Sequence, residues 1–237
     1  MTRELLGRGC HVAVLVRAES DGLKALRASH GDRLSIHRGD VTEEASLRAM
    51  FAELAQRLGH LDIIINNAVT YLDGSRPSLE EADLSICART FEVNAVGPLR
   101  VIQQGLPLLR RGQRKLIVNV SSEAGSIGDC RRTTEYAYCM SKSALNMGSK
   151  LVQNLLAPEG VQVLALHPGW FNSSGKGPAP ISAEEACVKV LQTILKPRAL
   201  VRRSSWQRAW MAPALVYAMG SIAAFWVFDR LWAVFGG

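Results

Sequence analysis

Tyr138 and Lys142 stand four positions apart in a segment that predicts a helix, so their side chains share one face. An ammonium group beside a phenol stabilises the phenolate and lowers the tyrosine pKa from about 10. A tyrosine tuned in this way can act as a general acid or base near neutral pH. The spacing is also common on ordinary solvated helices, so the pair acquires meaning only from its surroundings.

Ser122 supplies part of that context. The apolar run 115–120 predicts a strand that ends at Ser121 and Ser122, and the next predicted helix starts close to Tyr138. Ligands of open parallel sheets bind beyond the carboxyl ends of the strands. We therefore expect Ser122, Tyr138 and Lys142 to meet in a crevice at that edge of the sheet.

The elements that must position these side chains alternate along the chain. Short runs rich in Val, Ile and Leu predict strands buried on both faces, and segments of helical periodicity separate them. This alternation predicts an α/β fold with a doubly wound parallel sheet. Thr42, followed by two glutamates, is the expected N-cap of the second helix. The predicted strands are 11–16, 34–37, 61–66, 115–120 and 161–166, and the predicted helices are 22–29, 43–58, 79–109, 135–156 and 183–195.

Further motifs occur around the chemical residues. The chain reads Ser122-Glu-Ala-Gly and then Tyr138-Cys-Met-Ser-Lys142, and other motifs stand at Asp40-Val41, Asn66-Asn-Ala-Val, Asn94-Ala-Val-Gly and Pro168-Gly. In order and spacing they resemble the short-chain dehydrogenase/reductase family over about residues 2–196. The stretch from His167 to Trp170 is most similar to the sniffer and C-factor-like carbonyl reductases. The resemblance implies a Rossmann-like fold.

The resemblance also implies a role for each of four catalytic residues. Tyr138 would give a proton to a carbonyl oxygen as hydride arrives from the nicotinamide, or would take one in the reverse direction. Lys142 would lower the tyrosine pKa and bind the nicotinamide ribose, and Ser122 would hydrogen-bond the substrate oxygen. Asn94 would hold a water that links Lys142 to solvent.

The implied cofactor is a nicotinamide dinucleotide. Arg17 ends the first predicted strand, where an acid favours the ribose 2′-hydroxyl of NAD and an arginine accommodates the 2′-phosphate of NADP. We therefore expect NADP(H) rather than NAD(H), with an ordinary surface charge as the alternative interpretation of Arg17. The five histidines lack metal-ligand spacing, so no metal is expected. The other residues that the resemblance places at the cofactor are Asp40, Val41, Asn66, Tyr138, Lys142, Phe171 and Ser173.

The sequence departs from the family at its start. The family's first strand and Gly-x-x-x-Gly-x-Gly turn, whose amides hold the pyrophosphate, have no counterpart in the 237 residues. The opening residues look like the rear half of the following helix, with Gly7 and Gly9 at its end. The absent strand would be central in the sheet, so its neighbours would be left with unpaired edges. Val69 is a second departure, because it stands where the family has glycine.

The other end of the chain departs as well. Lysine and arginine exceed aspartate and glutamate by 28 to 21, and five basic residues without an acid fall within 196–208. The uncharged stretch 209–228 follows, long enough to span about 30 Å of hydrocarbon, with tryptophans near its ends. We expect a Rossmann-like domain over 1–196, a basic linker over 197–208, a transmembrane or membrane-associated helix over 209–228, and a short tail over 229–237. A docked helix, a dimer contact and a helix in the membrane plane are the alternatives.

These observations lead to two functional hypotheses. The first is an NADP(H)-dependent oxidoreductase that interconverts an alcohol and a ketone or aldehyde and acts on a small apolar substrate. Its catalytic domain would face the cytoplasm beside a membrane, and it could form homo-oligomers. The second is a truncated, non-catalytic membrane-associated interaction protein with weak or no cofactor binding. Basic residues do not interleave with aromatic ones, so nucleic-acid binding is excluded.

Overall fold

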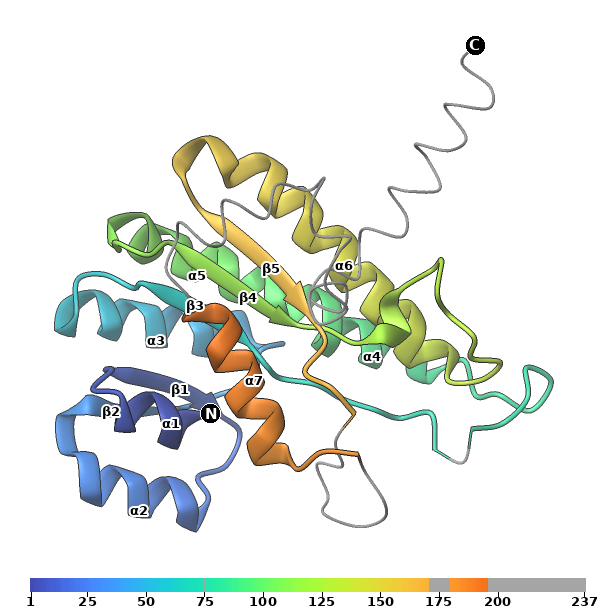
Figure 1. Ribbon diagram of the computed structural model, residues 1–237, viewed down its shortest axis with the longest axis horizontal. Coiled ribbons are helices and arrows are strands. Elements are labelled where there is room, and N and C mark those ends of the chain that lie inside the picture. The colour runs from blue at the N-terminus through green and yellow to red at the C-terminus, as the bar shows by residue number, and fades with distance from the viewer. Residues whose placement is uncertain (75, 171–179, 196–237) are drawn as a thin grey trace.

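The computed structural model describes residues 1–74, 76–170 and 180–195, and shows parallel strands flanked by helices (Figure 1). The short runs of branched apolar residues form strands, as predicted, because such runs can be buried on both faces of a parallel sheet. The strands are β1 (Val12–Val16), β2 (Leu34–Arg38), β3 (Ile63–Asn66), β4 (Leu116–Val120) and β5 (Gln162–Leu166).

The strands form two separate parallel sheets. β1 pairs with β2, and β4 pairs with β3 on one side and β5 on the other. Among the described residues no strand pairs β1 with β3, which is the place where the sequence predicts a central strand to be absent. The α/β fold class is confirmed, but the expected single sheet is interrupted at this point.

The helices follow the predicted segments with two corrections. The long predicted helix 79–109 is wrong at its start, because residues 79–85 form turns and the helix begins at Ile86. Thr42 is not the N-cap of the second predicted helix, since its N–H and hydroxyl both donate to Asp40 and Glu43 occupies the cap position. The helices are α1 (Thr2–Gly7), α2 (Asp21–His30), α3 (Glu44–Arg57), α4 (Ile86–Phe91), α5 (Gly97–Arg111), α6 (Tyr136–Leu156) and α7 (Ala183–Ile194).

Helices cover both faces of the three-stranded sheet. Successive side chains of a strand point to opposite faces, so Ile117 of β4 faces one side and Leu116 and Val118 face the other. Ile117 packs in one core cluster with residues of α5 and α6, whereas Leu116 and Val118 pack with α7. Leu5 of α1 and Met1, which precedes α1, pack against the same cluster as α7.

A third cluster joins the two sheets. Leu47, Phe51 and Leu54 of α3 are buried against Leu108 of α5, and Leu15 of β1 packs on the same cluster. α3 also lies beside α5 in Figure 1. Helix packing therefore holds β1 and β2 next to the larger sheet where no strand hydrogen bonds do so.

The ends of the described chain bear on two expectations. α1 ends at Gly7, and Gly9 has a φ of +82°, a left-handed conformation that glycine adopts readily after a helix. Within the described ranges, no helix is both long enough and apolar enough to cross a bilayer. The predicted linker 197–208, apolar helix 209–228 and tail 229–237 lie outside the described residues.

Candidate active site

Ser122 lies at the carboxyl end of β4. Four of the five residues of this strand are buried, and the Ser121 N–H donates to Leu166 of β5, so the strand end is firmly placed. Ser122 then caps the short 3-10 helix Glu123–Gly125 through its hydroxyl. A Cβ on Gly125 would lie 2.8 Å from the Lys142 carbonyl oxygen, so glycine lets this turn pack directly on α6.

Lys142 reaches the same strand end from α6. Its side chain is only 2% exposed, and Nζ donates to the Val120 carbonyl oxygen at 2.9 Å. The ammonium nitrogen lies 5.7 Å from the centroid of the Tyr138 ring. Burial lowers the pKa of Lys142 to about 8, because an uncompensated charge is costly away from water. The predicted meeting of Ser122, Tyr138 and Lys142 at one strand end is confirmed.

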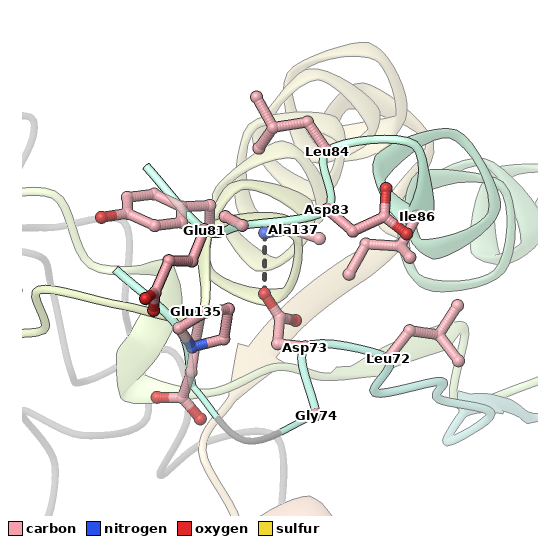
Figure 2. A pocket seen from close by; sticks show the side chains of 12 residues that line it. Leu72, Asp73, Gly74, Glu81, Asp83, Leu84, Ile86, Glu135 and Ala137 are labelled. Carbon is pink, nitrogen blue, oxygen red and sulfur yellow. Dashed lines mark hydrogen bonds between the residues drawn. The ribbon is translucent and has the colours of Figure 1, made fainter. Parts of the chain in front are cut away.

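Tyr138 is fixed by the start of α6. The backbone N–H groups of Ala137 and Tyr138 donate to the two carboxylate oxygens of Asp73, each at 3.1 Å. Figure 2 shows the first of these hydrogen bonds. The first amides of a helix have no partner within the helix, and an aspartate normally caps them from the N-cap position. Here the cap comes from 64 and 65 residues away, so the loop after β3 holds the start of α6 in place.

The electrostatics of Tyr138 differ from the expectation. Burial raises its pKa above the usual value, the nearby Ser122 hydroxyl lowers it, and the negative charge of Glu123 raises it further. The predicted lowering is therefore wrong for the protein described here, although Lys142 lies close to the ring. Deprotonation of this phenol needs help from its hydrogen-bond partners.

Asn94 completes the set from the long helical segment. It lies in a π-helical turn, Glu92–Val96, between α4 and α5, a distortion that is frequent at functional sites. Its amide accepts from the Thr70 N–H at 2.8 Å and donates to Thr70 O and to Ser141 Oγ. Ser141 Oγ donates in turn to the Tyr138 carbonyl oxygen. Asn94 thus links the loop after β3 to the tyrosine helix.

The residues predicted for the adenine end of a cofactor lie where β1 and β2 end. Arg17 is exposed directly after β1, and Asp40 follows β2. The pKa of Asp40 is lowered, chiefly because the Thr42 N–H donates to it and to a smaller extent because Arg89 and Arg17 lie near it. Val41 packs against α5, since a Cβ on Gly97 would lie 2.9 Å from its side chain.

The remaining cofactor predictions have different outcomes. The buried side chain of Asn66 donates to Asn119 Oδ1 at 2.8 Å and so ties β3 to β4. Its contact with a cofactor stays a prediction. Phe171 and Ser173 lie outside the described residues. Val69 is exposed and does not have a positive φ, so the backbone there does not require the family's glycine.

Comparison with known proteins decides the family. The family model described as short chain dehydrogenase matches residues 1–180. The chain belongs to the short-chain dehydrogenase family. It is thus a member of a family of oxidoreductases, as the motifs around Ser122, Tyr138 and Lys142 indicate.

Individual relatives place this dehydrogenase more narrowly. It is 39% identical to the C-signal protein of Myxococcus xanthus over 137 residues, which are 57% of this chain and 81% of that protein. The chain spans only between 40% and 66% of the length of seven other curated relatives. Carbonyl reductase from chicken fatty liver, solved with NADPH bound, has a TM-score of 0.74 at 26% identity, covering 83% of this chain and 85% of that one. Carbonyl reductase Sniffer of D. melanogaster has a TM-score of 0.73 at 26% identity, covering 79% and 81%. The predicted relation to the sniffer and C-factor-like group is confirmed.

The dehydrogenase also has a charged network beside its catalytic set that the sequence analysis missed. Arg132, from the loop after β4, pairs with both Glu123 and Glu135. Glu135 is buried in a left-handed conformation, with a φ of +65°, and accepts a hydrogen bond from the Tyr71 hydroxyl at 2.7 Å. His167 Nδ1, at the end of β5, lies 3.4 Å from Glu123. The sequence offered one signal for this network: its charged residues lie in loops that follow the carboxyl ends of strands, where ligand sites of parallel sheets are found.

A cavity of about 410 Å³ lies beside this set (Figure 2). The described residues that line it include Leu72, Asp73, Glu81, Leu84, Glu135 and Ala137, but not Ser122, Tyr138 or Lys142. It is thus a hollow beside the start of α6, and the Ser122 and Tyr138 side chains do not line it.

Proposed function

We propose that this dehydrogenase interconverts an alcohol and a ketone or aldehyde, with NADP(H) as cofactor. The observation that carries the proposal is the convergence of three groups at the end of β4. Lys142 is bound there to the Val120 carbonyl oxygen, its ammonium lies 5.7 Å from the Tyr138 ring, and the Ser122 hydroxyl is near enough to Tyr138 to lower its pKa. An assembled proton-transfer set of this kind favours an enzyme over the non-catalytic alternative.

Each residue has a distinct part in the proposed reaction. The cofactor, when bound, supplies a hydride to the carbonyl carbon or removes one from the alcohol carbon. The Tyr138 hydroxyl gives its proton to the carbonyl oxygen in reduction and takes the alcohol proton in oxidation. Ser122 hydrogen-bonds the reacting oxygen, and Lys142 places a positive charge near the phenol. Asn94 holds the tyrosine helix against the loop after β3.

The residues around the strand ends suit a nicotinamide dinucleotide in part. Exposed Arg17 beside Asp40 offers a positive charge for a 2′-phosphate, and Val41 offers an apolar contact for adenine. Lys142 can bind the nicotinamide ribose. The NADPH bound to the chicken carbonyl reductase supports the same choice of cofactor.

Exposed apolar side chains support an apolar substrate. Large apolar groups on the surface commonly mark ligand or partner sites. In this dehydrogenase several lie on the loops that follow β3, β4 and β5, which are the loops next to Ser122 and Tyr138 in a parallel sheet. They are Val69, Tyr71, Leu72, Ile127 and Trp170.

We further propose that the protein associates with a membrane, with the catalytic domain on the cytoplasmic side, and with a second copy of itself. The membrane proposal rests on the sequence of 196–228, in which a basic segment precedes an uncharged apolar one. Recovery of all the protein in the soluble fraction after alkaline extraction would contradict a spanning anchor. The second copy is suggested by an apolar stripe on α6, described below.

The enzymatic proposal is tested by NADPH consumption with a panel of apolar aldehydes and ketones. We expect Tyr138→Phe to lower the rate by at least about a hundredfold, because it removes the transferable proton. Tyr136→Phe is the matched control, since the Tyr136 hydroxyl donates only to Thr133 O among the described contacts. Equal rates in wild type and Tyr138→Phe would show that the family fold is kept here without catalysis.

A further inference from the structure

The Ser122 hydroxyl is in close contact with its neighbour in the sequence. Ser122 Oγ lies 2.6 Å from Glu123 Oε2, and it accepts the Ala124 N–H at 3.2 Å. A hydroxyl has one hydrogen to donate and two lone pairs that accept. Hydrogen bonds to ionised oxygens are short, and 2.6 Å is within that range.

The carboxylate of Glu123 is held in its ionised form. Burial acts to raise the pKa of Glu123, but the hydrogen bonds from Ser122 and Arg132, together with the charges of Arg132 and His167, leave it below the usual value. An ionised carboxylate can only accept, so the hydrogen in the Ser122–Glu123 contact belongs to Ser122. It is the only hydrogen that the Ser122 hydroxyl can donate.

The proposed reaction needs the same hydrogen elsewhere. A carbonyl oxygen that gains negative charge is stabilised by hydroxyl groups that donate to it, and a tyrosinate is stabilised in the same way. A hydrogen bond from Ser122 would lower the pKa of Tyr138, whereas the charge of Glu123 raises it. The two influences are connected, because Ser122 cannot donate to Glu123 and to the reacting oxygen with one hydrogen.

We propose that Glu123 is a positioning residue that accepts the single hydroxyl hydrogen of Ser122. Ser122 can then donate to the reacting oxygen only after its hydrogen bond to Glu123 opens. Arg132 makes the opening feasible, since it remains paired with Glu123 when Ser122 turns away. His167 Nδ1 lies 3.4 Å from Oε2 of Glu123, the same oxygen that Ser122 contacts, whereas Arg132 pairs with Oε1. The proposal rests on the proposed function for its catalytic consequence, but the hydrogen-bond assignment does not.

The decisive test is a double-mutant cycle of Glu123→Gln and Ser122→Ala. Its first readout is the pKa of Tyr138, obtained from tyrosinate absorbance as the difference between each variant and the same variant with Tyr138→Phe. Glu123→Gln should lower this pKa in both backgrounds, because it removes a negative charge. The shift should be roughly twice as large with Ser122 present, because the freed hydroxyl can then donate to the phenolate. Equal shifts in the two backgrounds would overturn the proposal.

The second readout is the kcat/KM of carbonyl reduction. We expect Glu123→Gln to raise it about three- to tenfold, because the substrate oxygen no longer competes with a charged acceptor. The gain should vanish in the Ser122→Ala background. Glu44→Gln, an exposed glutamate of α3 that pairs with Arg48, is the control and should change neither readout. An unchanged or lower kcat/KM in Glu123→Gln, at intact secondary structure, would argue against the proposal.

A second variant guards against misfolding. Glu123→Asp keeps the charge for Arg132 but shortens the side chain, so it should lengthen the Ser122 contact and lower the Tyr138 pKa in the same Ser122-dependent way. If wild type itself fails to reduce any carbonyl, the proposed function fails, and the tyrosinate titration still decides the role of Glu123.

Discussion

At the scale of single residues, the amine of Lys142 is buried beside the phenol ring of Tyr138. Lys142 makes one hydrogen bond to a carbonyl oxygen among the described contacts, and burial lowers its pKa to about 8. The amine therefore begins to lose its proton near physiological pH, and the charge beside Tyr138 depends on pH. This couples the stability of the fold to the chemistry of the site.

Lys142 should give the protein a recognisable pH dependence of stability. Between pH 8 and about 10.5, the unfolded chain binds the Lys142 proton while the folded chain has released it, so unfolding becomes harder as pH rises. Over this window the free energy of unfolding of wild type, measured in urea, should rise by about 3 kcal/mol relative to Lys142→Met. Below pH 8 the amine is charged in both states and the difference should level off.

The control for this measurement is Lys24→Met. Lys24 is exposed on α2 and pairs with exposed Asp21, so its removal should leave the pH dependence as it is in wild type. A wild-type curve parallel to that of Lys142→Met from pH 8 to 10.5 would mean that Lys142 is not buried in solution.

At the scale of elements, the start of α6 depends on a loop from another part of the chain. The N-cap residue of α6, Glu135, has no capping hydrogen bond of its own and is instead held by Tyr71, Arg76 and Arg132. Asp73 accepts hydrogen bonds from the amides of Ala137 and Tyr138 in its place. The position of the catalytic tyrosine is therefore set by a loop that follows β3.

Replacing Asp73 should weaken both the fold and the site. Asp73→Ala leaves two buried amides without their acceptor, and we expect a loss of about 1–2 kcal/mol in the free energy of unfolding. Turnover should fall as well, because Tyr138 is one of the two residues released. Asp73→Asn keeps one accepting oxygen and should lie between wild type and Asp73→Ala in both measurements.

Glu81→Ala provides the matched comparison for Asp73. It removes an exposed carboxylate from the same cavity and should change the unfolding free energy by less than about 0.5 kcal/mol. If Asp73→Ala is as stable as Glu81→Ala, water satisfies the amides and the cap is unimportant.

At the scale of the whole molecule, one helix face has no cover among the described residues. α6 exposes Met140, Met147, Leu151 and Leu155, which are spaced by seven, four and four residues and so share one face. Methionines at helical spacing are usually core residues, but Met140 and Met147 are 44% and 60% exposed. An uncharged apolar stripe of this kind is self-complementary about a two-fold axis, which suits a second copy of the chain.

A charge in the middle of this stripe should separate the copies. We expect wild type to sediment as a dimer or higher oligomer at micromolar concentration and Leu151→Lys to sediment as a monomer, because a buried unpaired ammonium is costly. Leu79→Lys is the control, since Leu79 is about as exposed but lies in the turns before α4. A monomeric wild type would refute the proposal.

The sequence alone determined the order of the elements and the core of the site. Short runs of branched apolar residues that alternate with helical segments favour buried parallel strands, and the carboxyl ends of such strands lie at one edge of the sheet. Ser122, Tyr138 and Lys142 followed from this rule. The absent central strand followed as well, and the interruption between β1 and β3 agrees with it.

Only the tertiary structure decided the electrostatic environment and the supports of the site. How deeply a polar side chain such as Tyr138 is buried has no local signature in the sequence, so its raised pKa ran against the expectation from its neighbour Lys142. The Asp73 cap and the Arg132 network join segments far apart in the chain, and no spacing rule predicts such contacts. Asn66 shows the same limit, because its motif was recognised but its hydrogen bond to Asn119 of β4 was not predicted. Local periodicity fixes which residues share a face, whereas packing between elements fixes what each side chain meets.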